Sequence, residues 1–220
     1  MTTGGVKTGS VKTRSAVSMR ALSTSAIAII AIAVSVSLTG CTSNDSLATQ
    51  YNKSGNTGNY VSADGSTKTI AVADRGKAVA YSGTTDAGNQ VSSTDFLGKV
   101  VVLNFWYASC PPCRLESKDL EALNQKYAPK GVVFVGVNKE DTAATARSFE
   151  VSHGVTYPSI LDVDSGAVSL AFTTAHAISP NAVPTTLIID AKGRVAARFS
   201  GLITSPSLVG QVIESTMAEK

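Results

Sequence analysis

The stretch VVVLNFWYASCPPCRLESKDLEALNQKYA, residues 100–128, places an unbroken apolar run directly before two cysteines and an amphipathic segment. The run at 100–106 is rich in β-branched and aromatic residues, which is typical of a strand buried on both faces. After the cysteines, four apolar residues recur near helical spacing, with the charges on the other side of the helix: Leu115, Leu120, Leu123 and Tyr127. This pattern predicts a helix. The cysteines therefore lie where a buried strand ends and a helix begins.

The chain on either side supplies the rest of an α/β domain. Gly131 ends the first helix, and VVFVGVN at 132–138 predicts a second buried strand, so that strand, helix and strand imply a right-handed parallel βαβ unit. Further elements are expected as follows: two short strands within 78–93, a helix at 142–154 closed by Gly154, a strand at 158–162, a short helix at 164–172, a hairpin at 186–200 and a final helix at 205–217. The expected fold is a three-layer α/β domain with a mixed central sheet.

The basic residues are unevenly distributed. The chain has 220 residues and a net charge of +3, but four of its basic residues and none of its acidic ones precede residue 41. The remainder is slightly acidic, so nucleic-acid binding has no electrostatic support. After the positive residues comes a charge-free apolar stretch that ends in Leu38-Thr39-Gly40-Cys41. A positive segment, an apolar segment and small residues are the pattern of an export signal.

The end of this segment resembles the lipobox of bacterial lipoproteins. The resemblance implies a signal peptide over residues 1–40, lipid on Cys41 and a location on the extracytoplasmic face of the cell membrane. An uncleaved membrane anchor is the alternative, since the run is near the lower length limit for a span. Residues 41–66 are rich in Ser, Asn, Thr and Gly, which predicts a flexible polar tether. The folded domain is expected over 67–220.

The remaining two cysteines, Cys110 and Cys113, allow three interpretations. At a helix N-terminus, free N–H groups and the helix dipole favour a thiolate, which lowers the pKa of Cys110 and makes it an attacking thiol. Cys113, one turn later, then acts as the resolving thiol, while Pro111 and Pro112 suit the first turn. A structural disulfide closing so short a loop would constrain the unfolded chain little. A metal site needs further ligands, and His153 and His176 lack paired spacing, so no metal is expected.

The segment NFWYASCPPCRLE resembles the active site of the thioredoxin superfamily, and most of all its extracytoplasmic TlpA/ResA-like branch. The resemblance extends from about Gly76 to the C-terminus through GKVVVLNFW, YAPKGVVFVGVN, GVTYP, AVPTTLIID and GRV. It implies a thioredoxin-like fold with an extra N-terminal hairpin and a central insert. It also implies a redox-active Cys110–Cys113 disulfide, with no bound cofactor.

The same resemblance assigns roles to residues around the cysteines. Pro184 is expected to form a cis peptide bond and to pack against the cysteine pair, and Val183 to offer its backbone to an extended substrate. Trp106, Pro111 and Pro112 are expected to border the substrate site, although a core role for Trp106 is at least as well supported. Relatives commonly carry tryptophan at the position of Ser109, so serine is expected to open the approach to Cys110.

The resemblance leaves the proton acceptor for Cys113 open. Asn104 stands where ordinary thioredoxins have a buried Asp, and an amide cannot accept the proton. Some relatives place an acidic residue after the second buried strand, which here points to Asp141 or Glu140. Glu116 is a weaker candidate and is expected to be a solvated charge on the first helix.

The expected reaction is reduction of disulfides in exported proteins, of which apocytochrome c is one family precedent. The pair would be re-reduced by a membrane electron donor of the CcdA/DsbD type. The direction depends on the reduction potential, so a DsbA-like oxidase or isomerase is the alternative. A lipid-anchored copper-binding module that uses the same thiols is another.

Overall fold

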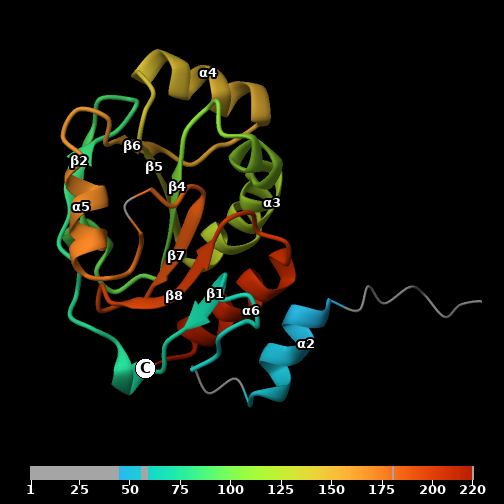
Figure 1. The fold of residues 1–220 in the computed structure, drawn as a ribbon. Helices are drawn as coiled ribbons and strands as arrows, with labels where there is room; N and C mark the ends of the chain where they lie inside the picture. The colour runs from blue at the N-terminus through green and yellow to red at the C-terminus, as the bar shows by residue number, and fades with distance from the viewer. Residues whose placement is uncertain (1–44, 56–58, 180, 220) are drawn as a thin grey trace, which may run out of the picture. The chain divides into compact units, whose positions relative to one another are not determined.

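A six-stranded mixed sheet forms the centre of the fold, with its strands in the order β1-β8-β7-β4-β5-β6 (Figure 1). It is seen in a computed structural model that describes residues 45–55, 59–179 and 181–219. β4 pairs in parallel with β5, and β5 with β6, whereas β7 is antiparallel to both β4 and β8. The predicted combination of a parallel βαβ half with an antiparallel hairpin half is confirmed.

The helices and strands have the following bounds: α2 Ser46–Lys53, β1 Thr67–Thr69, η1 Val72–Asp74, β2 Ser82–Thr84, β3 Gln90–Ser92, η2 Ser93–Phe96, β4 Val101–Trp106, α3 Pro111–Tyr127, η3 Ala128–Lys130, β5 Val133–Asn138, α4 Ala143–His153, β6 Ser159–Leu161, α5 Ala167–Thr174, β7 Thr185–Ile189, β8 Val195–Ser200 and α6 Pro206–Met217. β2 and β3 form a separate antiparallel hairpin. This is the expected extra hairpin before the first buried strand.

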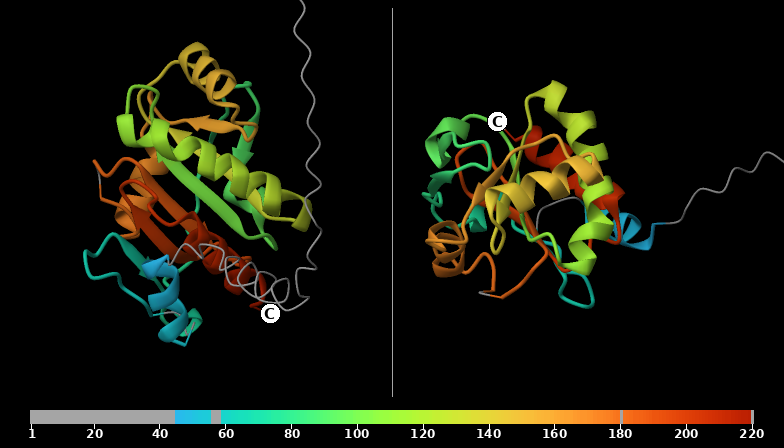
Figure 2. Two further views of the ribbon diagram at one scale, coloured as in Figure 1. Left: turned by 90° about the vertical axis from the view of Figure 1, so that its right-hand side faces the viewer. Right: turned by 90° about the horizontal axis from the view of Figure 1, so that it is seen from above.

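Helices cover both faces of the sheet, and all six residues of β4 are buried between them (Figure 2). On one face, apolar residues of α2, α3 and α6 pack together on the sheet, with Leu120, Tyr127 and Ile213 almost fully buried. On the other face, α5 packs through Val168 and Phe172. Because β4 is apolar on both sides, it occupies the centre and delivers its C-terminal end to the start of α3.

The N-terminal part of the described chain is not a flexible tether. Residues Ser46–Lys53 form α2, which begins at Asp45, where the carboxylate accepts hydrogen bonds from the N–H groups of Leu47 and Ala48 at 3.2 Å. Tyr51 is 2 % exposed and its hydroxyl lies 3.1 Å from that of Ser215 on α6. The predicted tether over residues 41–66 is therefore corrected for residues 45–55. The polar composition of this segment gave no sign of the N-cap at Asp45 or of the buried Tyr51, which hold α2 against the rest of the domain.

We expect Tyr51→Ala to lower the free energy of unfolding by about 3 kcal/mol, because the change removes a buried aromatic ring. Asn52→Ala, an exposed neighbour on the same helix, is the matched control and should change it by less than about 0.5 kcal/mol. Urea unfolding of the exported domain from Asn44 onward measures both. Equal, small effects of the two variants would mean that α2 does not dock in solution.

The predicted export signal and Cys41 lie outside the described residues, so both remain predictions. Within the described ranges, none of the helices has the length and apolar character that crossing a membrane requires.

Candidate functional site

The two cysteines form a disulfide at the first turn of α3. Cys110 is the N-cap residue, and its Sγ accepts a hydrogen bond from the N–H of Cys113 at 3.2 Å. Pro111 and Pro112 occupy the first turn, where a missing N–H removes no helical hydrogen bond. The expected strand-to-helix position is confirmed. In this oxidised form Cys110 is 1 % and Cys113 3 % exposed, so position on the helix, rather than exposure, distinguishes the two sulfurs.

Trp106 packs in the buried cluster that contains the disulfide. It is 4 % exposed and packs in one cluster with Cys110, Cys113 and Phe149 of α4. Its ring centroid lies 4.5 Å from that of Phe149. The indole Nε1–H donates to Ser159 Oγ of β6 at 3.1 Å. These contacts give Trp106 a core role, and contact with substrate remains a prediction.

The loop before β7 lies on the same cluster. The Val183–Pro184 peptide bond is cis, as expected, and Val183 is partly buried against the cluster that contains the cysteines. The carbonyl of Pro184 accepts a hydrogen bond from the N–H of Gly201 at 2.8 Å. This bond joins the cis-proline loop to the segment between β8 and α6.

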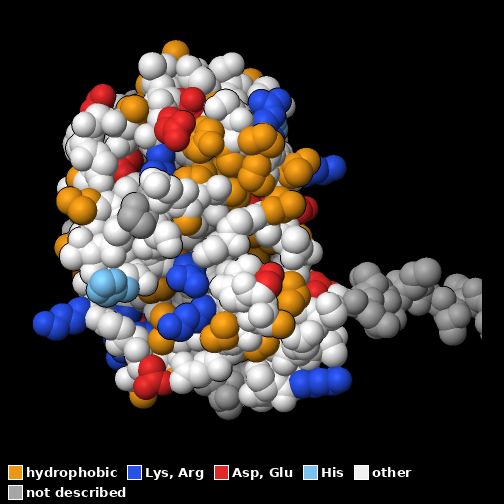
Figure 3. All heavy atoms as spheres, viewed as in Figure 1, with side chains coloured by type: hydrophobic (Ala, Val, Ile, Leu, Met, Phe, Trp, Pro, Cys, Tyr) orange, Lys and Arg blue, Asp and Glu red, His pale blue; other side chains and the backbone are white. Residues whose placement is uncertain are grey.

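Exposed side chains surround the first turn of α3. Ser109 and Pro111 are exposed, and Leu115 and Leu202 are 68 % and 38 % exposed. Figure 3 shows apolar side chains gathered over this end of the molecule. The inclusion of Leu115 in the buried face of the helix was wrong, because that residue faces solvent beside the site. An apolar surface of this kind suits contact with a protein partner.

Asp141 holds the loop that leads into Cys110. Its Oδ2 accepts from the N–H of Ala108 at 2.6 Å and from Asn138 Nδ2 at 2.8 Å. Glu140 is exposed, and its N–H donates to Asn138 Oδ1. These contacts give Asp141 a structural task at the site. Proton transfer by Asp141 or Glu140 stays a prediction.

Glu116 is the functional candidate that the sequence reasoning placed wrongly. It is 1 % exposed, not solvated. Its Oε1 accepts from Asn104 Nδ2 at 2.9 Å and its Oε2 from the N–H of Ile203 at 3.1 Å. Burial raises its pKa to about 7, although the hydrogen bonds from Ile203 and Asn104 act in the opposite direction.

The spacing of α3 carried the signal that identifies Glu116 as buried. Residue 116 precedes Leu120, Leu123 and Tyr127 by four, seven and eleven positions, so it lies on the buried face of the helix. Its partner Asn104 lines a small cavity together with Cys113. A buried carboxyl group with a raised pKa is thus hydrogen-bonded to a residue that lines the same small cavity as the resolving thiol.

The histidines and other potential metal ligands do not assemble. His153 stacks on Phe149 with ring centroids 3.9 Å apart, and His176 follows α5 with a φ of 56°. Among the residues that the structure describes, no three His, Cys, Asp or Glu side chains are grouped so as to hold a metal ion.

Comparisons with known proteins agree with this geometry. Residues 71–212 match the model of the Redoxin family. The chain is 32 % identical over 117 residues to the thiol-disulfide oxidoreductase ResA of Bacillus subtilis, a match that covers 53 % of this chain and 62 % of that protein. It is 29 % identical over 130 residues to ResA of Halalkalibacterium halodurans, covering 59 % of this chain and 67 % of that one.

Solved structures show the same fold over nearly their whole length. A secreted thiol-disulfide isomerase from Corynebacterium glutamicum has a TM-score of 0.61 and 30 % identity, covering 72 % of this chain and 96 % of that one. A DsbF homologue from Corynebacterium diphtheriae has a TM-score of 0.60 and 29 % identity, covering 71 % and 97 %. Together with the cysteine pair at the start of α3 and the cis-proline loop beside it, these matches show that the chain belongs to the Redoxin family and has the thioredoxin-like fold of its ResA-like members.

Proposed function

We propose that this protein is a membrane-tethered, extracytoplasmic thiol-disulfide oxidoreductase that reduces disulfides in exported proteins. The observation that carries the proposal is the Cys110–Cys113 disulfide at the N-terminus of α3. There the helix dipole and the N–H of Cys113 stabilise a thiolate on Cys110. The ResA relatives are named thiol-disulfide oxidoreductases, which supports the same chemistry.

The reaction is two successive thiol–disulfide exchanges. The Cys110 thiolate attacks one sulfur of a substrate disulfide, forming a mixed disulfide and releasing the other substrate sulfur as a thiolate. The Cys113 thiolate then attacks Cys110, closing the protein disulfide and releasing the second substrate sulfur. Two electrons pass to the substrate, and a membrane donor of the CcdA/DsbD type returns two electrons to the oxidised pair.

Glu116 is the group we propose to accept the proton of Cys113. A general base is most effective when its pKa lies near the working pH, and burial places the pKa of Glu116 at about 7. Asn104 connects the carboxyl group to the cavity that Cys113 borders. Asp141 instead uses its carboxylate to hold the active-site loop.

We propose that the tether is short. Cys41, the predicted lipid attachment site, precedes Asp45 by four residues, a span of at most about 14 Å. The Asp45 carboxylate accepts hydrogen bonds from Ser205 and Ser207 at the start of α6. A lipid on Cys41 would therefore keep the domain close to the bilayer, where a membrane donor and apocytochrome c, the substrate class suggested by the resemblance, would meet it.

A thiol oxidase or isomerase is the second candidate, because one similar structure is described as a secreted thiol-disulfide isomerase. The reduction potential of the Cys110–Cys113 pair distinguishes the two directions. We expect a value closer to the about −270 mV of thioredoxin than to the about −120 mV of DsbA. Equilibration of the exported domain with glutathione or dithiothreitol buffers measures it, and a value above about −150 mV would reverse the proposed direction.

A further inference from the structure

A groove lies beside the redox site, between the segment that leads into Cys110 and helix α4. Its volume is about 420 Å³. On the side of the disulfide it is lined by Ala108 and Arg114, and on the side of α4 by Ala144, Ser148, Phe149 and His153. Ala108 precedes Cys110 by two residues, and Arg114 follows it by about one helical turn. A molecule in the groove would therefore lie beside the segment that carries the reacting sulfur.

Arg114 brings a positive charge to this groove. Its side chain is exposed and turns back toward the active-site loop, where Nη1 donates to the carbonyl of Ala108 at 3.4 Å. Among the described residues, no carboxylate forms an ion pair with it. The five N–H donors of a guanidinium form a planar fork that matches a carboxylate. Because one long hydrogen bond uses little of that capacity, Arg114 can still bind a carboxylate from outside.

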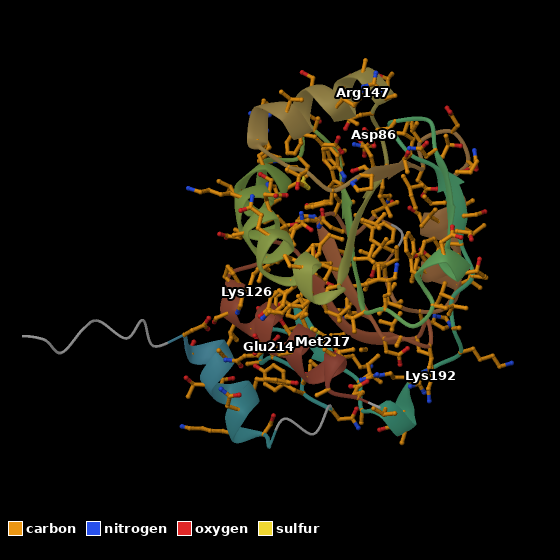
Figure 4. The ribbon with its side chains drawn as sticks, turned by 180° about the vertical axis from the view of Figure 1, so that it is seen from behind. Asp86, Lys126, Arg147, Lys192, Glu214 and Met217 are labelled. Atoms are coloured by element: carbon orange, nitrogen blue, oxygen red, sulfur yellow. A yellow bond between two sulfur atoms is a disulfide. The ribbon has the colours of Figure 1, made fainter. Side chains whose placement is uncertain are left out.

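The other charged groups near the groove are engaged elsewhere. None of the described residues that line it is acidic. Asp141 contacts the same loop, but its carboxylate already accepts from the N–H of Ala108 at 2.6 Å. Arg147 of α4 donates to the carbonyl of Asp86, and Figure 4 shows these two residues side by side. The lining thus carries the positive charge of Arg114 without an acidic residue opposite it.

The α4 wall of the groove combines small and aromatic side chains. Phe149 is 7 % exposed and belongs to the buried cluster that contains both cysteines. The His153 ring stacks on it, and the Nδ1 of that ring lies 3.0 Å from the carbonyl oxygen of Phe149. Ligand sites typically join apolar walls to a few placed polar groups that fix orientation. This wall suits the aliphatic part of an acidic side chain whose carboxylate reaches Arg114.

We propose that this groove is a specificity subsite for substrates that carry an aspartate or glutamate close to the reacting cysteine. The inference rests on the proposed function and names the substrate class of the same site. In the first exchange, the Cys110 thiolate bonds to the substrate sulfur next to the acidic residue, and the other substrate sulfur leaves as a thiolate. The acidic side chain lies in the groove with its carboxylate on Arg114, which holds the substrate while the new disulfide forms.

Small disulfides of equal length test the charge preference: dithiodipropionate is an anion, hydroxyethyl disulfide is neutral and cystamine is a cation. Acid quenching and mass spectrometry measure how fast each one oxidises the reduced protein. Each variant is compared with the wild type on the same probe, so that differences between the leaving thiols cancel.

We expect Arg114→Gln to lower the ratio of the dithiodipropionate rate to the hydroxyethyl disulfide rate by about fivefold, since an exposed ion pair is lost. A general effect of Arg114 on the Cys110 thiolate would change both rates equally and leave the ratio as it is. Lys118→Gln is the matched control, because Lys118 is an exposed cation one turn further along α3 and does not line the groove. It should leave the ratio unchanged.

Ala144→Glu tests the opposite wall of the groove. Ala144 is exposed in the first turn of α4, where an acidic residue favours the helix, so this variant should fold. We expect it to slow dithiodipropionate and to accelerate cystamine relative to hydroxyethyl disulfide, and both effects should shrink in about 1 M salt. Unchanged ratios in Arg114→Gln and Ala144→Glu would overturn the inference and leave the proposed function intact. If none of the probes oxidised the wild type, the proposed function would be contradicted, and this inference with it.

Discussion

We expect Cys110→Ser to lower the rate of insulin-disulfide reduction by at least about a thousandfold, because Cys113, the other thiol of the site, lacks the position at the helix N-terminus that stabilises a thiolate. Removal of the nucleophile from an enzyme whose residues act as a unit abolishes nearly all catalysis. Cys110 is the nucleophile in this prediction because it is the N-cap of α3 and its Sγ receives the N–H of Cys113. Cys113 lies inside the helix, and within the described part of the chain no N–H group donates to its Sγ.

Cys113→Ser is the matched partner of that variant, and its expected behaviour is different. It should still attack a substrate disulfide once but should retain the substrate as a mixed disulfide with Cys110, since the resolving thiol is missing. Non-reducing electrophoresis and mass spectrometry of the trapped species detect this and also identify substrates. If Cys110→Ser traps substrates and Cys113→Ser does not, the two roles are reversed.

The strands of the core were predictable because each is set by a local pattern. The runs at 100–106 and 132–138 are apolar on both faces, and the structure places them as neighbouring parallel strands with Val101 opposite Val133. Gly154, with a φ of 69°, ends α4 where the sequence placed its stop. These features depend on residues close in sequence, which is the information a single chain supplies.

The errors arose where long-range contacts decide. α2 depends on Asp45 binding Ser205 and Ser207, some 160 residues away, and its polar composition predicted a tether. Glu116 is buried because Asn104 and Ile203 supply its hydrogen-bond donors from β4 and from the segment before α6. Glu116 was expected to be a solvated charge on the first helix, but its spacing to Leu120 and Tyr127 places it on the buried face.

Glu116→Gln should remove a large part of the pH dependence of both stability and exchange. A carboxyl group whose pKa rises from 4.5 to about 7 on folding destabilises the native state by up to about 3 kcal/mol once it is ionised. The stability of the wild type therefore falls as the pH rises from about 4.5 to about 7. We expect Glu116→Gln and wild type to be similar at pH 5, and the variant to be more stable by about 1–3 kcal/mol at pH 8.

Proton uptake by Glu116 also requires a rearrangement that glutamine imitates. Both carboxylate oxygens accept hydrogen bonds, one from Asn104 and one from Ile203, so the protonated acid can donate its proton to Asn104 only if the amide turns to present its oxygen. Glutamine imposes the same arrangement at every pH but cannot accept a proton. We therefore expect the resolution step, measured in single turnovers with a mixed disulfide, to slow at pH 8 by about a hundredfold.

Asp164→Asn is the control for this pair of measurements, because it removes an exposed carboxylate that is not among the groups that shift the pKa of Glu116. It should keep both the slope of stability against pH and the fast resolution at pH 8. Glu150, which titrates in the same range, leaves a residual slope in Glu116→Gln, so the slope should fall by about half rather than vanish. A Glu116→Gln protein that resolves the mixed disulfide at the wild-type rate at pH 8 would remove Glu116 from the mechanism and return the proton of Cys113 to solvent or to Asp141.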